Sequence, residues 1–228
     1  MLDFDDKVLA GLPFAALIAG ITLAGLWLSN VVYDRGVPHY VSRKIGHAAG
    51  GLGFLLILLF FTSSLWPILL ALIFGLVLLA ARIARPVTFR GVGGTGRSDN
   101  AMAEVWFPWV AVPVFAGAWW GLNRSDIAVA CLLFMAWGDG VTGLVRALVY
   151  RKPVKGLWGS LAMLCVCLII SWALIRPFWI GAVASLAATF TEWAFGDVGA
   201  IKWADDTWAI PLASRGVVLA AAALSGNL

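Results

Sequence analysis

The chain has 228 residues, of which 62% are hydrophobic and 12% are charged, and its mean hydropathy is +0.94. A water-soluble domain carries roughly a quarter charged residues, so this composition excludes a soluble enzyme, a disordered chain and a coiled coil. The three cysteines, Cys131, Cys165 and Cys167, lie in apolar stretches, which excludes a disulfide-rich secreted fold. The sequence therefore predicts an all-α, polytopic transmembrane helical bundle that forms one domain over residues 1–228.

Apolar runs long enough to cross a bilayer as helices, each of about 17–26 residues, fill most of the chain. Eight of them cover about 8–33, 45–61, 65–83, 105–122, 126–150, 157–176, 178–195 and 208–224. The residues before the first run hold three aspartates and one lysine. Because a cleavable signal peptide begins with positive charge, we expect the first run to be retained as a span.

Lysine and arginine are unevenly distributed among the connections between these runs. Four alternate connections, including the long one at about 84–104, hold twelve of these residues, whereas the connections on the other side hold three. By the positive-inside rule, the rich connections are cytoplasmic and both termini are extracytoplasmic. Because topology accounts for the basic residues, we expect no nucleic-acid partner.

The first polar group, at the start of the second apolar run, consists of Arg43, Lys44 and His47. An ionisable residue within a membrane span is costly and is a functional candidate by default. His47 follows Arg43 by four residues and Lys44 by three, so a helix presents all three on one face. Such a cationic face suits phosphate binding. The alternative is a positive-inside flank with a histidine bonded to a neighbouring helix.

The second group is centred on Asp139, which lies between Gly138 and Gly140. A carboxylate beside glycines, where a ligand can approach the backbone closely, suits a Mg²⁺ ion that carries nucleotide phosphates. Arg146 lies on the same helical stripe seven residues later. The alternative is a structural Asp139–Arg146 pair, although two helical turns separate the two residues by roughly 10 Å.

The third group, at the mouth of the sixth run, contains Lys155 and Ser160 beside Gly156 and Gly159. A lysine and a hydroxyl at the start of a helix can hold phosphate oxygens. The alternative is a plain interfacial flank.

The fourth group, Asp205 and Asp206, opens the last apolar run. These acids are candidate metal ligands, which Glu192 near the end of the seventh run can join. The alternative is that they cap the helix that follows.

The connection at about 84–104 contains a G-x-G-x-x-G pattern at residues 91–96. The pattern does not follow a strand in a βαβ unit, so a dinucleotide site is rejected. We interpret the segment as a flexible hinge in a cytoplasmic loop that could cover the site. Glu104, where the chain re-enters the membrane, either faces the same site or has a purely structural role.

In their order, these motifs resemble those of the membrane-embedded CTP-dependent lipid kinases. That family includes dolichol kinase, phytol kinase and the yeast-type diacylglycerol kinase, and it is related to the phosphatidate cytidylyltransferases. The family segments R-K-x-x-H-x-x-G, G-D, K-S-x-E-G-S and D-D-N with a following proline are matched at 43–50, 138–140, 155–160 and 205–211. The chain differs from the family pattern at Arg146, Gly156, Trp158 and Thr207.

The resemblance implies a kinase that transfers a phosphoryl group from CTP, or another nucleoside triphosphate, to the hydroxyl of a lipid alcohol such as a polyprenol, dolichol or phytol. By resemblance, Asp139, Asp205 and Asp206 hold Mg²⁺ or Mn²⁺. The groups expected to neutralise phosphate charge are Arg43, Lys44, Arg146 and Lys155, with Ser160 as a further phosphate ligand. Either His47 or Asp139 accepts the proton of the alcohol.

Two other functions are compatible with the sequence. A cytidylyltransferase-like enzyme, which makes a CDP-lipid and pyrophosphate, needs the same ion and the same cations. A non-enzymatic transporter or scaffold requires polar groups throughout the membrane depth, whereas the outer connections here are short and nearly uncharged. Under either enzymatic function, we expect the acids and bases to converge from separate helices into one pocket on the cytoplasmic side.

Overall fold

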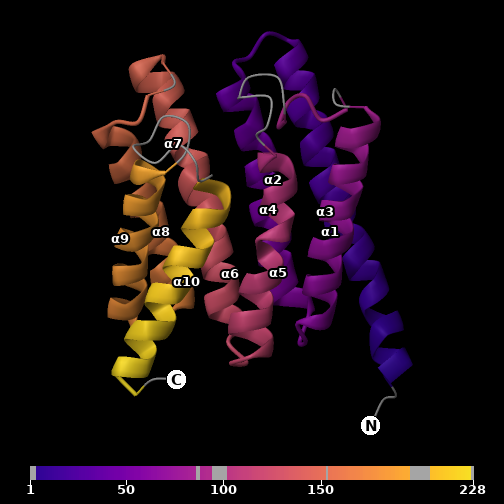
Figure 1. Ribbon diagram of the computed structural model, residues 1–228, viewed down its shortest axis with the longest axis vertical. Helices are drawn as coiled ribbons and strands as arrows, with labels where there is room; N and C mark the ends of the chain where they lie inside the picture. The colour runs from indigo at the N-terminus through magenta and orange to yellow at the C-terminus, as the bar shows by residue number, and fades with distance from the viewer. Residues whose placement is uncertain (1–3, 86–87, 94–101, 153, 196–205, 227–228) are drawn as a thin grey trace.

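The computed structural model describes residues 4–85, 88–93, 102–152, 154–195 and 206–226. Throughout this part of the chain the regular structure is helical and contains no strand, which confirms the predicted all-α class. The helices run alternately up and down, and the N- and C-terminal ends both lie at the lower end of the molecule in Figure 1. The helical segments are α1 Phe4–Asp34, α2 His39–Phe60, α3 Leu65–Ala84, α4 Ala103–Trp109, α5 Ala111–Val114, η1 Phe115–Trp120, α6 Ser125–Leu133, η2 Phe134–Gly138, α7 Asp139–Val145, η3 Arg146–Tyr150, α8 Leu157–Leu174, α9 Phe178–Ala194 and α10 Asp206–Leu224.

Six helices of the described chain are long and apolar enough to cross a membrane. They are Leu9–Asp34, His39–Phe60, Leu65–Ala84, Ser125–Tyr150, Leu157–Leu174 and Asp206–Leu224. The run expected at 105–122 is instead divided among α4, α5 and η1, and α9 has only 17 residues. An integral membrane protein is therefore supported, whereas the count of eight spans stays a prediction.

The segment from α6 to η3 forms the centre of the bundle. Residues 127–136 are all buried, because α2, η1, α8 and α10 pack around them. A helix that is hydrophobic on every face is expected in such a position. This central segment carries Asp139 toward the upper end of the molecule.

Wide π-helical turns flank α7 on both sides, at Phe134–Gly138 and Arg146–Tyr150. Such turns are rare and occur frequently at functional sites. Gly138 ends the first wide turn, and a Cβ there would lie 2.8 Å from Cys167 Sγ on α8. The glycine therefore lets α8 pack closely just before the chain reaches Asp139.

The described part of the connection between α3 and α4 is fixed against α1 and α2. Gly91 N donates to Asn30 Oδ1 at 2.8 Å, and Ser42 Oγ donates to Gly91 O at 2.9 Å. A Cβ on Gly91 would lie 2.4 Å from the carbonyl carbon of Ser29, so this close approach requires glycine. Gly91 and its next two neighbours are buried, so the hinge interpretation is wrong for them, and residues 94–96 lie outside the described residues.

Candidate functional site

Arg43, Lys44 and His47 lie on the inward face of α2 and are buried. The helix begins at His39, before the start of the run expected at about 45–61, so the three residues lie one to two turns inside it. Arg43 Nε donates to His47 Nε2 at 3.3 Å. The spacing of four residues therefore places the two side chains in contact on one face, as the sequence predicted.

Asp139, the first residue of α7, lies against this face of α2. Lys44 Nζ donates to Asp139 Oδ2 at 2.6 Å, and His47 Nδ1 lies 3.5 Å from the same oxygen. Thr142 Oγ1 donates to Asp139 Oδ1 at 3.1 Å. Lys44 reaches the carboxylate across Gly143, where a Cβ would lie 2.5 Å from Lys44 Cε.

Glu192 on α9 connects two of the candidate phosphate ligands. It forms an ion pair with Arg146 of η3, and its Oε1 lies 3.3 Å from Lys155 Nζ. Arg146 therefore pairs across helices with Glu192, which replaces the alternative of a structural pair with Asp139 on its own helix.

Asp206, the first residue of α10, connects Lys155 with Arg43. Its Oδ2 lies 3.6 Å from Lys155 Nζ, and its Oδ1 lies 3.7 Å from an Arg43 terminal nitrogen. Lys155 Nζ also donates to the backbone carbonyls of Glu192 and Phe195. The start of α10 and the end of α9 are thus tied together by one buried ammonium group.

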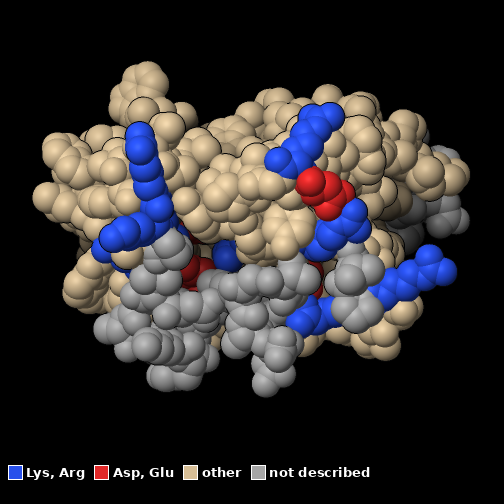
Figure 2. All heavy atoms as spheres, turned by 90° about the horizontal axis from the view of Figure 1, so that it is seen from above, with Lys and Arg blue, Asp and Glu red and all other residues tan. Residues whose placement is uncertain are grey.

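These contacts join eight side chains into what we call the charged cluster. Its members are Arg43, Lys44, His47, Asp139, Arg146, Lys155, Glu192 and Asp206. With His47 neutral, four cations face three carboxylates, which leaves a formal surplus of positive charge. The cluster lies toward the end of the molecule shown in Figure 2, where one acidic side chain lies at the surface and further acidic and basic atoms are seen deeper between other residues.

Three carboxylates of the charged cluster are close enough together to hold a metal ion. Asp139, Glu192 and Asp206 each offer an oxygen, and these oxygens lie within 4.8 Å of one another. Opposite ligands of an octahedral Mg²⁺ are roughly 4 Å apart, so a small closure of the site accommodates the ion. Hard carboxylate oxygens also suit Mn²⁺. The three carboxylates therefore fit the Mg²⁺ or Mn²⁺ ion that the sequence implied. Glu192 is the third ligand, beside Asp139 and Asp206.

Two described candidates, Ser160 and Glu104, form none of the contacts that define the charged cluster. Asp205 lies outside the described residues. Among the hydrogen bonds and ion pairs of the described chain, none involves the side chain of Ser160 on α8. Glu104 on α4 forms an ion pair with Arg82 of α3, so it stabilises the contact between these two helices and is separate from the three carboxylates.

The sequence interpretation missed two threonines as members of the site. Thr142 binds Asp139, and Thr207 Oγ1 accepts a hydrogen bond from Arg43 at 3.4 Å. Each threonine lies within three residues of a candidate acid, and this proximity is the signal that could have identified it. The carbonyl groups that bind Lys155 carry no sequence signal, because every residue has one.

Comparison with known proteins adds no relative from which a function could be transferred. No protein-family model, curated protein or solved structure matches the chain.

Proposed function

We propose that this protein is an integral membrane phosphotransferase that moves the terminal phosphoryl group of a nucleoside triphosphate to the hydroxyl of a lipid alcohol. CTP is the proposed donor, on the resemblance described above. The observation that carries the proposal is the charged cluster itself, in which three carboxylates and four cations converge from segments far apart in the sequence.

A purely structural role explains such a cluster poorly. Moving charged groups out of water costs several kcal/mol for each ion, and replacing a buried ion pair by apolar residues is often neutral or stabilising. A membrane bundle gains nothing from seven charged side chains in its interior unless they bind something. An anionic ligand with a divalent cation satisfies both signs of charge in the cluster.

In the proposed reaction the alcohol oxygen attacks the terminal phosphorus, and the bond from that phosphorus to the bridging oxygen breaks. The nucleoside diphosphate leaves, and the proton of the alcohol passes to His47 or to Asp139. Arg43, Lys44 and Lys155 release their carboxylate partners and bind phosphate oxygens, which stabilises the charge of the transition state. A divalent cation held by the three carboxylates would neutralise further phosphate charge.

The proposed topology places this chemistry on the cytoplasmic side. The charged cluster lies toward the upper end in Figure 1, away from both termini. With the termini extracytoplasmic and eight membrane segments, the cluster faces the cytosol, where nucleotides are available. The lipid acceptor then reaches the site laterally from the inner leaflet.

The test is an assay of the purified protein in lipid nanodiscs with Mg²⁺ and, in separate reactions, single-chain alcohols, diacylglycerol or phosphatidate. CTP labelled at its terminal phosphate is supplied, and the products are separated. Label in the lipid fraction supports the proposal. Label released as pyrophosphate when phosphatidate is the acceptor identifies a cytidylyltransferase instead, and no turnover of any nucleoside triphosphate overturns both enzymatic functions.

A further inference from the structure

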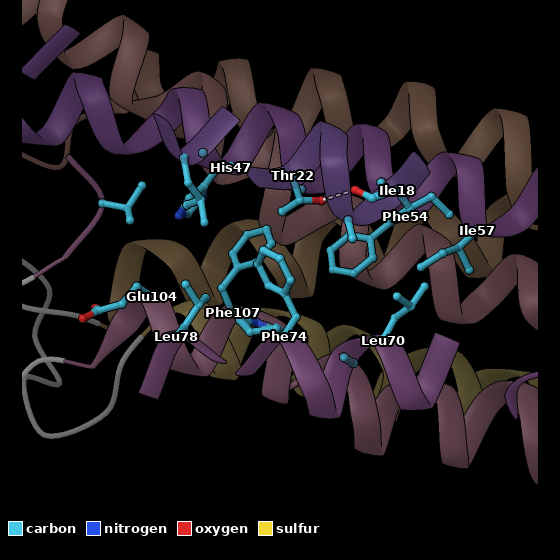
Figure 3. A pocket seen from close by; sticks show the side chains of 18 of the residues that line it. Ile18, Thr22, His47, Phe54, Ile57, Leu70, Phe74, Leu78, Glu104 and Phe107 are labelled. Carbon is cyan, nitrogen blue, oxygen red and sulfur yellow. Dashed lines mark hydrogen bonds between the residues drawn. The ribbon is translucent and has the colours of Figure 1, made fainter. Parts of the chain in front are cut away.

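An elongated cavity lies between α1, α2, α3 and α4, next to the charged cluster, and the centre of a water-sized sphere can occupy about 90 Å³ of it. Figure 3 shows it running from His47 and Glu104 at one end to Ile57 and Leu70 at the other. His47 and Ile57 are ten residues apart on α2, which corresponds to roughly 15 Å along the helix. The cavity is therefore long and narrow.

Polarity changes sharply along this cavity. Most of the described residues that line it are apolar, and its charged residues are Arg43, His47 and Glu104. His47 and Glu104 lie at the end shown on the left in Figure 3, and Arg43 contacts His47 from one helical turn earlier on α2. Thr22 lies between the two ends, but its hydroxyl donates to Ile18 O at 2.9 Å and is thereby satisfied within its own helix. The cavity thus has a polar head and an apolar body.

His47 forms the wall between the cavity and the charged cluster. Its ring packs against Phe107 of α4, with the ring centroids 4.9 Å apart, and its Nδ1 points toward Asp139 Oδ2 at 3.5 Å. The Nδ1 atom is buried and has no hydrogen-bond partner among the described atoms. A hydroxyl at the head of the cavity would therefore lie beside the group that connects it to the carboxylates.

We propose that this cavity binds the hydrocarbon chain of the acceptor, with the hydroxyl beside His47 and the chain extending toward Ile57 and Leu70. The inference rests on the proposed function and narrows its substrate to alcohols with a single chain. One narrow channel accommodates one chain, whereas diacylglycerol presents two chains side by side. The apolar end, lined by Ile57 and Leu70, then sets how much of the chain is enclosed.

Binding is tested without nucleotide, so that its outcome is independent of turnover. The probe is hexadecanol with a photoreactive diazirine at its far end, bound to the full-length protein in phosphatidylcholine nanodiscs. Saturable labelling of α2 or α3 near Ile57 and Leu70, competed by unlabelled hexadecanol and not by diacylglycerol, is the expected result. Labelling restricted to membrane-facing positions, or without competition, overturns the cavity as the chain site even where the protein transfers phosphate.

Two substitutions change the length of the cavity in opposite directions. Ala71→Phe fills the apolar end, where Ala71 lines the wall, and Ile57→Ala extends it. In competition among octanol, dodecanol, hexadecanol and eicosanol, we expect a shift of about tenfold in relative affinity, toward shorter chains for the first variant and longer chains for the second.

Ala80→Phe is the matched control, because Ala80 lies on the exposed face of the same helix, α3. It should leave the chain-length preference unchanged. A general loss of folding cannot move the preference in two directions, so the pair of cavity variants separates binding from stability. An unchanged preference in both folded variants overturns the inference, whereas shifted binding without any phosphoryl transfer overturns the proposed function alone.

Discussion

Charged side chains at the two ends of the bundle differ in their exposure to solvent and in the sequence distance to their partners. At the lower end, Arg124 pairs with Asp126 two residues away at 2.9 Å, and the two side chains are 25% and 34% exposed. Arg176 at that end donates to Trp172 O, one helical turn back along the chain. At the upper end, Arg43 donates to Thr207, 164 residues away, and both side chains are buried.

The difference indicates which charges are explained by the fold and which require another explanation. Arg124, Asp126 and Arg176 keep contact with solvent and find partners nearby in sequence, so they cost little to accommodate. The members of the charged cluster are removed from solvent and depend on partners from other helices, at a substantial cost in desolvation. Function is therefore expected at the upper end, and each of the following substitutions tests that contrast.

The largest effect is expected for Asp139→Asn, which keeps the shape of the side chain and removes its charge. Asp139 binds Lys44, lies beside His47 and contributes to the carboxylate triad. Loss of a group that positions the reacting atoms and the cation should lower phosphoryl transfer by about 100-fold or more. The measurement is the initial rate of label transfer to the lipid in nanodiscs.

Asp126→Asn is the matched control at the lower end. It removes the same charge from a partly exposed pair and should leave the rate unchanged. Full activity of a folded Asp139→Asn protein would contradict the assignment of the charged cluster as the catalytic site.

The next effect is on stability. Glu192→Gln leaves Arg146 and Lys155 buried without their shared carboxylate. Breaking a buried ion pair by removing one partner should lower the free energy of unfolding by roughly 3 kcal/mol. Reversible unfolding in mixed micelles measures this change, and Asp126→Asn should cost less than about 1 kcal/mol in the same assay. Equal losses in the two variants would remove the contrast between the ends.

A smaller effect is expected when the path of Lys44 is blocked. A Cβ at Gly143 overlaps the Lys44 side chain, so Gly143→Ala should move the ammonium group away from Asp139 and lower activity about tenfold. Gly216→Ala on α10 is the matched control, because a Cβ at that glycine meets no described atom within 4 Å. The ratio of the two rates, measured on proteins of equal thermal stability, reports the positioning of Lys44.

The smallest effect is expected for Arg90→Gln. Arg90 forms a bidentate ion pair with Asp34, but these side chains are 40% and 44% exposed. Although this pair lies at the upper end, its exposure should make its loss undetectable in both the rate and the thermal unfolding. A strong defect would show that the upper end depends on surface charge as well as on the charged cluster.

Helix positions were predicted well where one apolar run forms one continuous helix. The run expected at 157–176 corresponds to Leu157–Leu174, and the run expected at 208–224 to Asp206–Leu224. The run at 105–122 was less well predicted, because the local backbone around Pro108 and Pro113 divides it into short helices. Hydrophobicity reports burial in an apolar phase and does not report the hydrogen-bond pattern of the backbone.

The candidate residues were identifiable because charge in an apolar run is conspicuous, but their partners were not. The sequence spacing makes Arg146 a candidate partner of Asp139, and the structure instead pairs it with Glu192. The sequence position of Glu104 makes it a candidate neighbour of the site, and the structure pairs it with Arg82. Spacing along one helix identifies a shared face but cannot identify which helix packs against that face.

The sequence alone determined that the protein is a bundle of apolar helices with a few costly charges, because composition and hydrophobic run length are local properties of the chain. Only the tertiary structure decided that Asp139, Glu192 and Asp206 lie together and that an apolar cavity ends at His47. Both arrangements are set by side-chain packing between helices that are distant in sequence. Glycines such as Gly143, which contacts a side chain of a neighbouring helix, determine how closely these helices approach.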